Sequence, residues 1–317
     1  MEPTKGILLP SEITNLFPSR LNDALAKLPK TLLQNISEIR LRADRAVSLT
    51  IKQKNILLND EKNKLVTLTF GEISAVFERL CENSFYIYEN EMCLGYITLK
   101  GGHRVGFCGS IIQDQNEKNM VHNISSLNFR IGHDIKNAAE KVFPYIYDDK
   151  LHSCLIVSEP CGGKTTILTD VAFRLSALKI RSCVIDERGE ICACFLGVPQ
   201  KNVGNFCDVL DGYTKGEGMM IALRSLSPQV LICDEIGTSR DVEAMLEAMR
   251  AGVPVIATAH GATIDELLSR PQIRHLLDNG AIDKIILLKG ASHPGEIDQV
   301  IEVDDFDQDF WNSNDYI

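Results

Sequence analysis

Residues 153–170 constrain the fold of this chain more than any other stretch, because they join an apolar strand to a helix through a short loop of small residues. Such a loop lets backbone N–H groups converge on an anion, and the following helix points its positive end at the same place. Its last residues, Gly163, Lys164 and Thr165, match the end of a phosphate-binding loop. Lys164 would reach the β- and γ-phosphates of a nucleotide, and the Thr165 hydroxyl would bind Mg²⁺. The predicted nucleotide contacts in the loop are Pro160, Cys161, Gly162, Gly163, Lys164, Thr165 and Thr166.

Two positions depart from the usual pattern of this loop. Ser158 stands where the pattern has its first glycine, and Cys161 stands at a position that is often small. The first turn must therefore be made by a residue with a Cβ, although Gly162 adds a flexible site before Gly163. The loop alone leaves the strength of nucleotide binding open.

After residue 150 the sequence alternates between apolar strands and helices. Strands are predicted at 151–157, 180–185, 229–233 and 254–259, with helices at 165–178, 216–225 and 242–250. Near-continuous apolar strands are typical of a parallel sheet that has helices on both faces. Residues 136–317 are therefore predicted to form an α/β domain with a mainly parallel sheet, in which ligands bind at the carboxyl ends of the strands.

Residues 1–135 are predicted to form a smaller α+β domain. Its expected elements are a helix within 1–30, strands at 38–42, 47–51 and 64–68, a capped helix, a hairpin over 94–107 and a strand at 123–131. Thr69 and Glu72 have the spacing of a capping box, which marks the start of the capped helix. A helix containing Ala138, Ala139, Val142 and Phe143 is predicted to join the two domains. The length of 317 residues suits two domains.

Acidic residues follow the predicted strand at 229–233. Asp234 would bind Mg²⁺, and Glu235 would orient or deprotonate the water that attacks the γ-phosphate. Two acids after an apolar strand are common, but their place after the phosphate-binding loop and a helix favours this function.

A second group of acids follows the strand at 180–185. Asp186, Glu187 and Glu190 could reach the γ-phosphate, either as a base or through the metal. Alternatively, Asp186 and Glu190 cap the following turn or pair with Arg188. The sequence does not decide whether Glu187, Glu190 or Glu235 activates water.

Two basic side chains could each have either a functional or a structural role. His260 ends the strand at 254–259, where its imidazole could donate to a phosphate and report its presence, or could be structural. Arg224 ends a predicted helix and could contact phosphate or form a surface ion pair.

Composition excludes several other classes of protein. The net charge of -10 argues against a general nucleic-acid-binding protein. The ten cysteines form no Cys-x-x-Cys pair, which predicts reduced thiols in a cytosolic protein. No apolar run approaches the roughly 18 residues that span a bilayer, so membrane association would go through a partner. We expect a solvated acidic tail formed by Glu302, Asp304, Asp305, Asp307 and Asp309.

The order of these motifs is more specific than any one of them. The chain has a phosphate-binding loop, then an acidic strand end, then Ala-Leu-Arg before a second acidic strand end, and last a strand ending Ala-Thr-Ala-His. This order resembles that of the ATPases of type II and type IV secretion and of type IV pilus assembly. Within that superfamily the whole chain most resembles the stage III sporulation AA family of endospore formers, over most of residues 38–290. The segments that carry this resemblance are 95–98, 101–106, 125–130, 186–188, 197–200, 216–220 and 234–237.

This resemblance implies a RecA-like P-loop ATPase that forms a ring, with a hexamer as the expected size. It implies ATP and Mg²⁺ as cofactors and a cytoplasmic position at the mother-cell face of the channel to the forespore, in contact with membrane-bound components of that channel. Arg104 and Arg130 are candidates to reach the nucleotide from the N-terminal domain, or alternatively pair with acids on the surface. Two other functions stay open: a RecA-like protein that handles nucleic acid, and a structural ring subunit with little turnover.

Overall fold

The computed structural model covers residues Met1 to Ile317 and describes 9–52, 54–81, 92, 95–113, 119–132 and 135–303. The chain divides into two compact units, residues 1–133 and 134–317. Leu94 of the predicted hairpin and four acids of the predicted tail, Asp304, Asp305, Asp307 and Asp309, lie outside the described residues.

An antiparallel sheet of six strands forms the centre of the first unit. Its strands are β1 (Ile36–Arg42), β2 (Ser48–Ile51), β3 (Lys54–Leu57), β4 (Tyr96–Leu99), β5 (His103–Gln113) and β6 (Asn119–Arg130), in the order β3-β2-β1-β6-β5-β4. In β1, Ile39 and Leu41 are buried while Arg40 and Arg42 are half-buried. This alternation follows from the two-residue period of a strand, which gives the sheet one apolar and one polar face.

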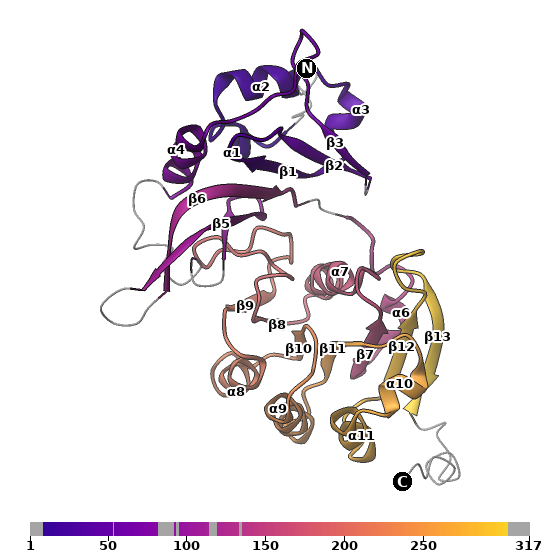
Figure 1. The fold of residues 1–317 in the computed structure, drawn as a ribbon. Coiled ribbons are helices and arrows are strands. Elements are labelled where there is room, and N and C mark those ends of the chain that lie inside the picture. The colour runs from indigo at the N-terminus through magenta and orange to yellow at the C-terminus, as the bar shows by residue number, and fades with distance from the viewer. Residues whose placement is uncertain are drawn as a thin grey trace, which may run out of the picture. The chain divides into compact units, whose positions relative to one another are not determined.

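The helices of the first unit cover the apolar face of this sheet (Figure 1). They are α1 (Ser11–Thr14), α2 (Ser19–Ala26), α3 (Lys30–Leu33) and α4 (Phe70–Leu80). The predicted capping box of α4 is confirmed, since the Glu72 N–H donates to Thr69 Oγ1 at 3.3 Å and the Thr69 N–H donates to the Glu72 carboxylate at 2.8 Å. This unit therefore has the α+β character that the sequence predicts.

A sheet of seven strands forms the centre of the second unit. Its strands are β7 (Cys154–Ser158), β8 (Ser182–Asp186), β9 (Cys207–Asp211), β10 (Val230–Cys233), β11 (Val255–His260), β12 (Lys284–Leu288) and β13 (Ile297–Glu302), in the order β13-β12-β7-β11-β10-β8-β9. All neighbouring pairs are parallel except β12 and β13. Every residue of β7, β8 and β10 is buried, as strands covered on both faces require.

Helices cover both faces of this second sheet (Figure 1). One face packs against α6 (Phe143–Ile146) and α7 (Lys164–Ala177). The other face packs against α8 (Lys215–Ser225), α9 (Ser239–Arg250), α10 (Ile264–Leu268) and α11 (Pro271–Asp278). The predicted fold class, a mainly parallel α/β core after a smaller α+β domain, is confirmed. None of the helices in the described part of the chain combines the length and apolar character needed to cross a membrane.

Several short elements differ from the sequence prediction. Residues 64–68 form isolated bridges rather than a strand. The predicted helix at 138–143 is a run of turns, and only α6 is helical. Pro144 explains where α6 begins, because proline lacks an N–H and is tolerated only in the first turn of a helix. Glu302 is not part of a frayed end, since it belongs to β13 and its carboxylate lies 3.4 Å from Lys284 Nζ.

Candidate functional site

The loop between β7 and α7 lies at the carboxyl edge of the second sheet. Ser158 ends β7 and is fully buried, and Gly163 is the N-cap of α7. Gly163 and Cys161 have φ angles of 93° and 63°. This left-handed conformation suits glycine but costs a residue with a Cβ roughly 1–2 kcal/mol. The departure at Cys161 therefore gives the loop a residue with a strained backbone and an exposed thiol.

The Lys164 ammonium group lies inside the loop. Its Nζ donates to the carbonyl oxygens of Ser158 and Glu159 at 2.6 and 3.1 Å, and to Ser158 Oγ at 3.2 Å. Burial lowers the pKa of Lys164, while Asp234 and Glu235 act in the opposite direction. The contact from Ser158 Oγ could not be predicted from the loop pattern, because the pattern has glycine at that position.

Thr165 and Asp234 meet at the start of α7. Thr165 Oγ1 donates to Asp234 Oδ2 at 3.2 Å, which joins the first turn of α7 to the end of β10. A hydroxyl and a carboxylate are hard oxygen ligands, and Mg²⁺ commonly takes only one or two carboxylates together with waters and substrate phosphates. Thr165 and Asp234, two of the three side chains predicted to bind Mg²⁺, therefore fit that ion.

Glu235 and His260 lie next to Lys164. His260 Nδ1 is 3.4 Å from Lys164 Nζ, and His260 Nε2 is 3.5 Å from Glu235 Oε1. Arg188 NH1 contacts the other carboxylate oxygen of Glu235 at 3.5 Å. The backbone of Glu235 has a φ of 33°, a strained value for a residue with a side chain. Such strain is concentrated at functional sites and persists only where neighbouring groups hold it.

The acids after β8 have other partners. Asp186 is buried, and its carboxylate accepts the N–H groups of Glu190, Ile191 and Cys192 at 2.8, 3.2 and 2.8 Å. This geometry is that of the alternative in which Asp186 caps the turn, and its role as a magnesium ligand stays a prediction.

Glu187 forms an ion pair with Lys215, a residue at the start of α8 that the sequence did not single out. The Lys215 side chain is largely buried, and its ammonium group pairs with the Glu187 carboxylate. Glu190 is an exposed residue of the turn that Asp186 caps. Glu235 is therefore the acid with the most direct approach to Lys164 and His260.

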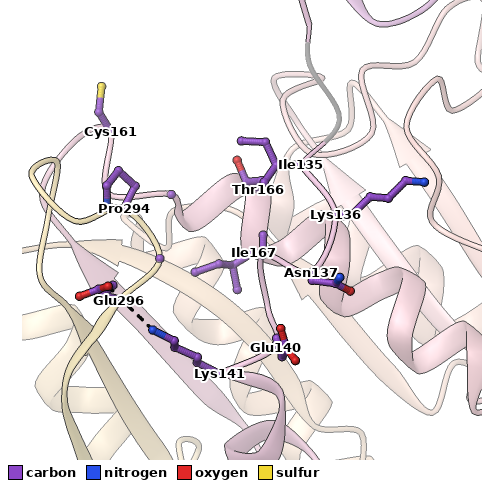
Figure 2. A pocket seen from close by; sticks show the side chains of 13 residues that line it. Ile135, Lys136, Asn137, Glu140, Lys141, Cys161, Thr166, Ile167, Pro294 and Glu296 are labelled. Atoms are coloured by element: carbon purple, nitrogen blue, oxygen red, sulfur yellow. Dashed lines mark ion pairs between the residues drawn. The ribbon is translucent and has the colours of Figure 1, made fainter. Parts of the chain in front are cut away.

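A pocket of about 460 Å³ opens beside the loop, within the size range of small-molecule sites. Its wall contains Thr166 and Ile167 from α7, residues 135–138, 140 and 141, and the connection between β12 and β13 (Figure 2). The Gly295 N–H in that connection donates to the Gly162 carbonyl at 2.9 Å. Figure 2 also shows the ion pair between Lys141 and Glu296, whose charged atoms are 3.8 Å apart.

Two of the three predicted arginines have partners within the first unit. Arg104 and Arg130 belong to the first unit, where they lie opposite each other on β5 and β6. Arg130 contacts Glu38 at 3.4 Å, and the Arg104 guanidinium lies 4.7 Å from the ring centre of Tyr96. Arg224 lies in the last turn of α8, and this helix begins at Lys215 beside the acids. At about 1.5 Å per residue along a helix, Arg224 is roughly 14 Å from that end.

The family of the chain follows from comparison with known proteins. The family model described as "Sporulation stage III, protein AA" matches residues 10–305. The chain belongs to this family. It is 37% identical over 300 residues to the stage III sporulation protein AA of Bacillus subtilis strain 168, a match that covers 93% of this chain and 95% of that protein. The resemblance to the stage III sporulation AA family is thereby confirmed.

Solved structures share the fold of this family member. The ATPase DotB of Legionella pneumophila aligns with a TM-score of 0.56 at 14% identity, over 90% of this chain and 78% of that chain. The pilus retraction motor PilT, solved with bound ADP, aligns with a TM-score of 0.55 at 16% identity, over 81% of this chain and 76% of that chain. At this level of identity the likeness shows the fold alone, which is a RecA-like P-loop core preceded by an α+β domain.

Proposed function

We propose that this member of the sporulation stage III protein AA family binds and hydrolyses ATP. The observation that carries the proposal is the cluster at the carboxyl edge of the second sheet, where Thr165 bonds to Asp234 and His260 lies between Lys164 and Glu235. A fixed cation, a hydroxyl with a carboxylate, and a second acid beside them are the groups that phosphoryl transfer to water requires.

Each group of the cluster has its own proposed role. Lys164 and the N–H groups of residues 161–166 would bind the phosphates, and Thr165 with Asp234 would hold Mg²⁺. When bound, Mg²⁺ neutralises charge on the β- and γ-phosphates. Glu235 would orient the attacking water and accept its proton. His260 contacts both Lys164 and Glu235, so it is placed to respond to the γ-phosphate.

The pocket beside the loop is the proposed site of the base and sugar. It adjoins Cys161, Gly163 and Thr166, so a nucleotide whose phosphates lie in the loop would extend directly into it. Its volume and its mixture of apolar and polar walls suit a purine nucleoside.

Family membership and fold support a proposal for the wider role. We propose a ring, with a hexamer as the expected size, that energises assembly of or transport through the channel between mother cell and forespore. Membrane-bound channel components would be its partners at the cytoplasmic mother-cell face. Arg104 and Arg130, neighbours on one sheet of the first unit, would reach the nucleotide and couple domain rotation to hydrolysis. A ring subunit with little turnover is the second candidate, favoured by the strained Cys161 in the loop.

Phosphate release by the purified protein tests this proposal. Wild type is expected to hydrolyse ATP, and Glu235→Gln is expected to slow it by about 10²–10⁴-fold, the usual contribution of a general base. Lys164→Ala should also abolish it because the phosphates lose their fixed cation. Glu243→Gln, which alters an exposed acid on α9, is the matched control and should keep wild-type turnover.

The oligomeric state, recorded with and without ATP and Mg²⁺, separates the two candidates. Hydrolysis that both active-site variants lose supports the motor. Equal background phosphate in all proteins, together with an ATP-dependent change in oligomer size, contradicts the motor and supports the structural ring.

ATP is expected to protect Cys161 from alkylation, and prior alkylation is expected to block ATP binding. Cys161 is exposed and lines the proposed nucleotide pocket. Burial raises the pKa of Cys183 and Cys194 to about 12, so these thiols stay protonated and react slowly. The measurement is peptide mass spectrometry after a timed exposure to iodoacetamide. Cys161→Ser should bind ATP after the same treatment, whereas equal labelling of Cys161 with and without ATP would contradict the assignment.

A further inference from the structure

A hydroxyl lies in the interior of the second sheet, next to the acids of the proposed site. Thr258 is fully buried in β11, whose other residues before His260 are Val, Ile and Ala. In register, β11 pairs with β7 on one side and with β10 on the other. A buried hydroxyl needs hydrogen-bond partners, and those of Thr258 are the two acids that follow β10.

The contacts of Thr258 fix both Asp234 and Glu235. Its Oγ1 donates a short hydrogen bond to Asp234 Oδ1 and accepts the Glu235 N–H at 2.8 Å. Its backbone carbonyl accepts the Ile236 N–H at 2.9 Å. The peptide groups on both sides of Glu235 are therefore bonded to one residue of the neighbouring strand.

These bonds explain how Glu235 keeps its backbone conformation. A φ of 33° is unfavourable for glutamate, and its N–H is held by two acceptors, Thr258 Oγ1 and, at 3.0 Å, Asp234 Oδ1. Because Asp234 Oδ1 is itself bonded to the Thr258 hydroxyl, loss of that hydroxyl would loosen both contacts. Both carboxylate oxygens of Asp234 accept hydrogen bonds, Oδ1 from Thr258 and Oδ2 from Thr165. A carboxylate held at both oxygens cannot rotate away from the first turn of α7.

We propose that Thr258 is a positioning residue that sets the Asp234 carboxylate for the metal and the Glu235 carboxylate for water at the same time. The inference rests on the proposed function, because it assigns Asp234 to Mg²⁺ and Glu235 to water. It adds that one hydroxyl couples the two roles, so its loss impairs both metal use and turnover.

The test compares Thr258→Val with Thr258→Ser. Valine has nearly the shape of threonine but no hydroxyl, whereas serine keeps the hydroxyl and loses a methyl group. Thr258→Val is expected to lower kcat by about 10- to 100-fold, because it removes hydrogen bonds to a carboxylate and to a partly buried N–H. It should also raise the Mg²⁺ concentration needed for half-maximal rate, while KM for ATP at saturating Mg²⁺ stays within about threefold. Thr258→Ser should restore kcat and the Mg²⁺ dependence.

A second readout needs no turnover. The affinity for a non-hydrolysable ATP analogue is measured in wild type and both variants, with Mg²⁺ and with EDTA. Wild type and Thr258→Ser are expected to bind more tightly with Mg²⁺, and Thr258→Val is expected to need a higher Mg²⁺ concentration for the same gain while its affinity in EDTA is unchanged.

The outcomes separate the inference from the proposed function. Failure of wild type to release phosphate overturns hydrolysis, and the Mg²⁺ dependence of analogue binding then decides the role of Thr258. If wild type hydrolyses ATP and Thr258→Val matches it in kcat and in Mg²⁺ dependence, the inference is overturned and the proposed ATP hydrolysis stands. Equal losses in Thr258→Val and Thr258→Ser also overturn it, because packing rather than the hydroxyl would then be responsible.

Discussion

Gly162→Ala is expected to weaken nucleotide binding by about 10- to 100-fold, and Ser158→Gly in the same chain is expected to restore most of it. A Cβ at position 162 would lie 2.2 Å from Ser158 Oγ and 2.8 Å from Ser158 Cβ. Ser158 is fully buried at the end of β7 and pairs in register with His260, so it cannot move away. Forcing an extra methyl group into such packing costs about 1–3 kcal/mol, and 1.4 kcal/mol corresponds to about tenfold in affinity.

The clash would displace the centre of the loop rather than its edge. Ser158 Oγ is also 3.2 Å from Lys164 Nζ, so a shift of Ser158 moves a contact of the ammonium group that should meet the phosphates. The serine that replaces the expected glycine thus creates the need for glycine at 162. Titration calorimetry with ATP and Mg²⁺ on the two single variants and the double variant measures the coupling between the positions.

Gly163→Ala provides the matched control. Gly163 has a φ of 93°, so alanine there is strained by the backbone itself, and Ser158→Gly cannot relieve that strain. Rescue at 162 without rescue at 163 is the expected pattern. A double variant at 158 and 162 that binds as weakly as Gly162→Ala would contradict the steric explanation and would mean that the phosphates need a bare backbone at 162.

The long buried strands and their ends could be predicted from the sequence. Apolar runs at β7, β8, β10 and β11 are buried on both sides, so their composition predicts strands without reference to neighbours. Parallel strands end at one edge, and so the sequence could place Lys164, Asp234 and His260 together. The structure has these three side chains within one cluster.

Elements at the margins of the sheets could not be predicted in the same way. β9 and β13 have polar and half-buried residues, and only their pairing with β8 and β12 makes them strands. Pairing of this kind depends on tertiary structure rather than on local pattern. The run of small and apolar residues at 138–143 resembles a helix, but it forms turns before α6.

The partners of individual side chains also required the structure. A sequence shows three acids that could activate water, but not that Lys215 pairs with Glu187 or that Asp186 binds the backbone. Thr258 carries no sequence signal, because threonine is common in strands and its acceptor role depends on the position of β10.

Asp186→Ala is expected to destabilise the second unit by about 2–4 kcal/mol in the absence of any nucleotide. The Asp186 carboxylate accepts three backbone N–H groups of the turn that follows β8. Alanine would remove this acceptor, and the three donors would lack a partner in a largely buried environment. An unsatisfied buried donor costs about 1–3 kcal/mol, and relaxation of the turn recovers part of the total. For a unit of this size each 1 kcal/mol lowers Tm by about 2–4 °C, so calorimetry should resolve the shift.

Asp208→Ala, which changes an exposed acid on the neighbouring strand β9, is the control and should stay within about 0.5 kcal/mol of wild type. The experiment also separates the two roles that the sequence allows for Asp186. A ligand of Mg²⁺ would be dispensable for folding without metal, so its loss would leave Tm in EDTA unchanged and reduce only the gain from ATP and Mg²⁺. A cap of the turn would lower Tm equally in EDTA and in Mg²⁺, because the carboxylate stabilises the backbone whether or not the site is filled. The three hydrogen bonds favour the second result, and an unchanged Tm in EDTA would return Asp186 to the metal site.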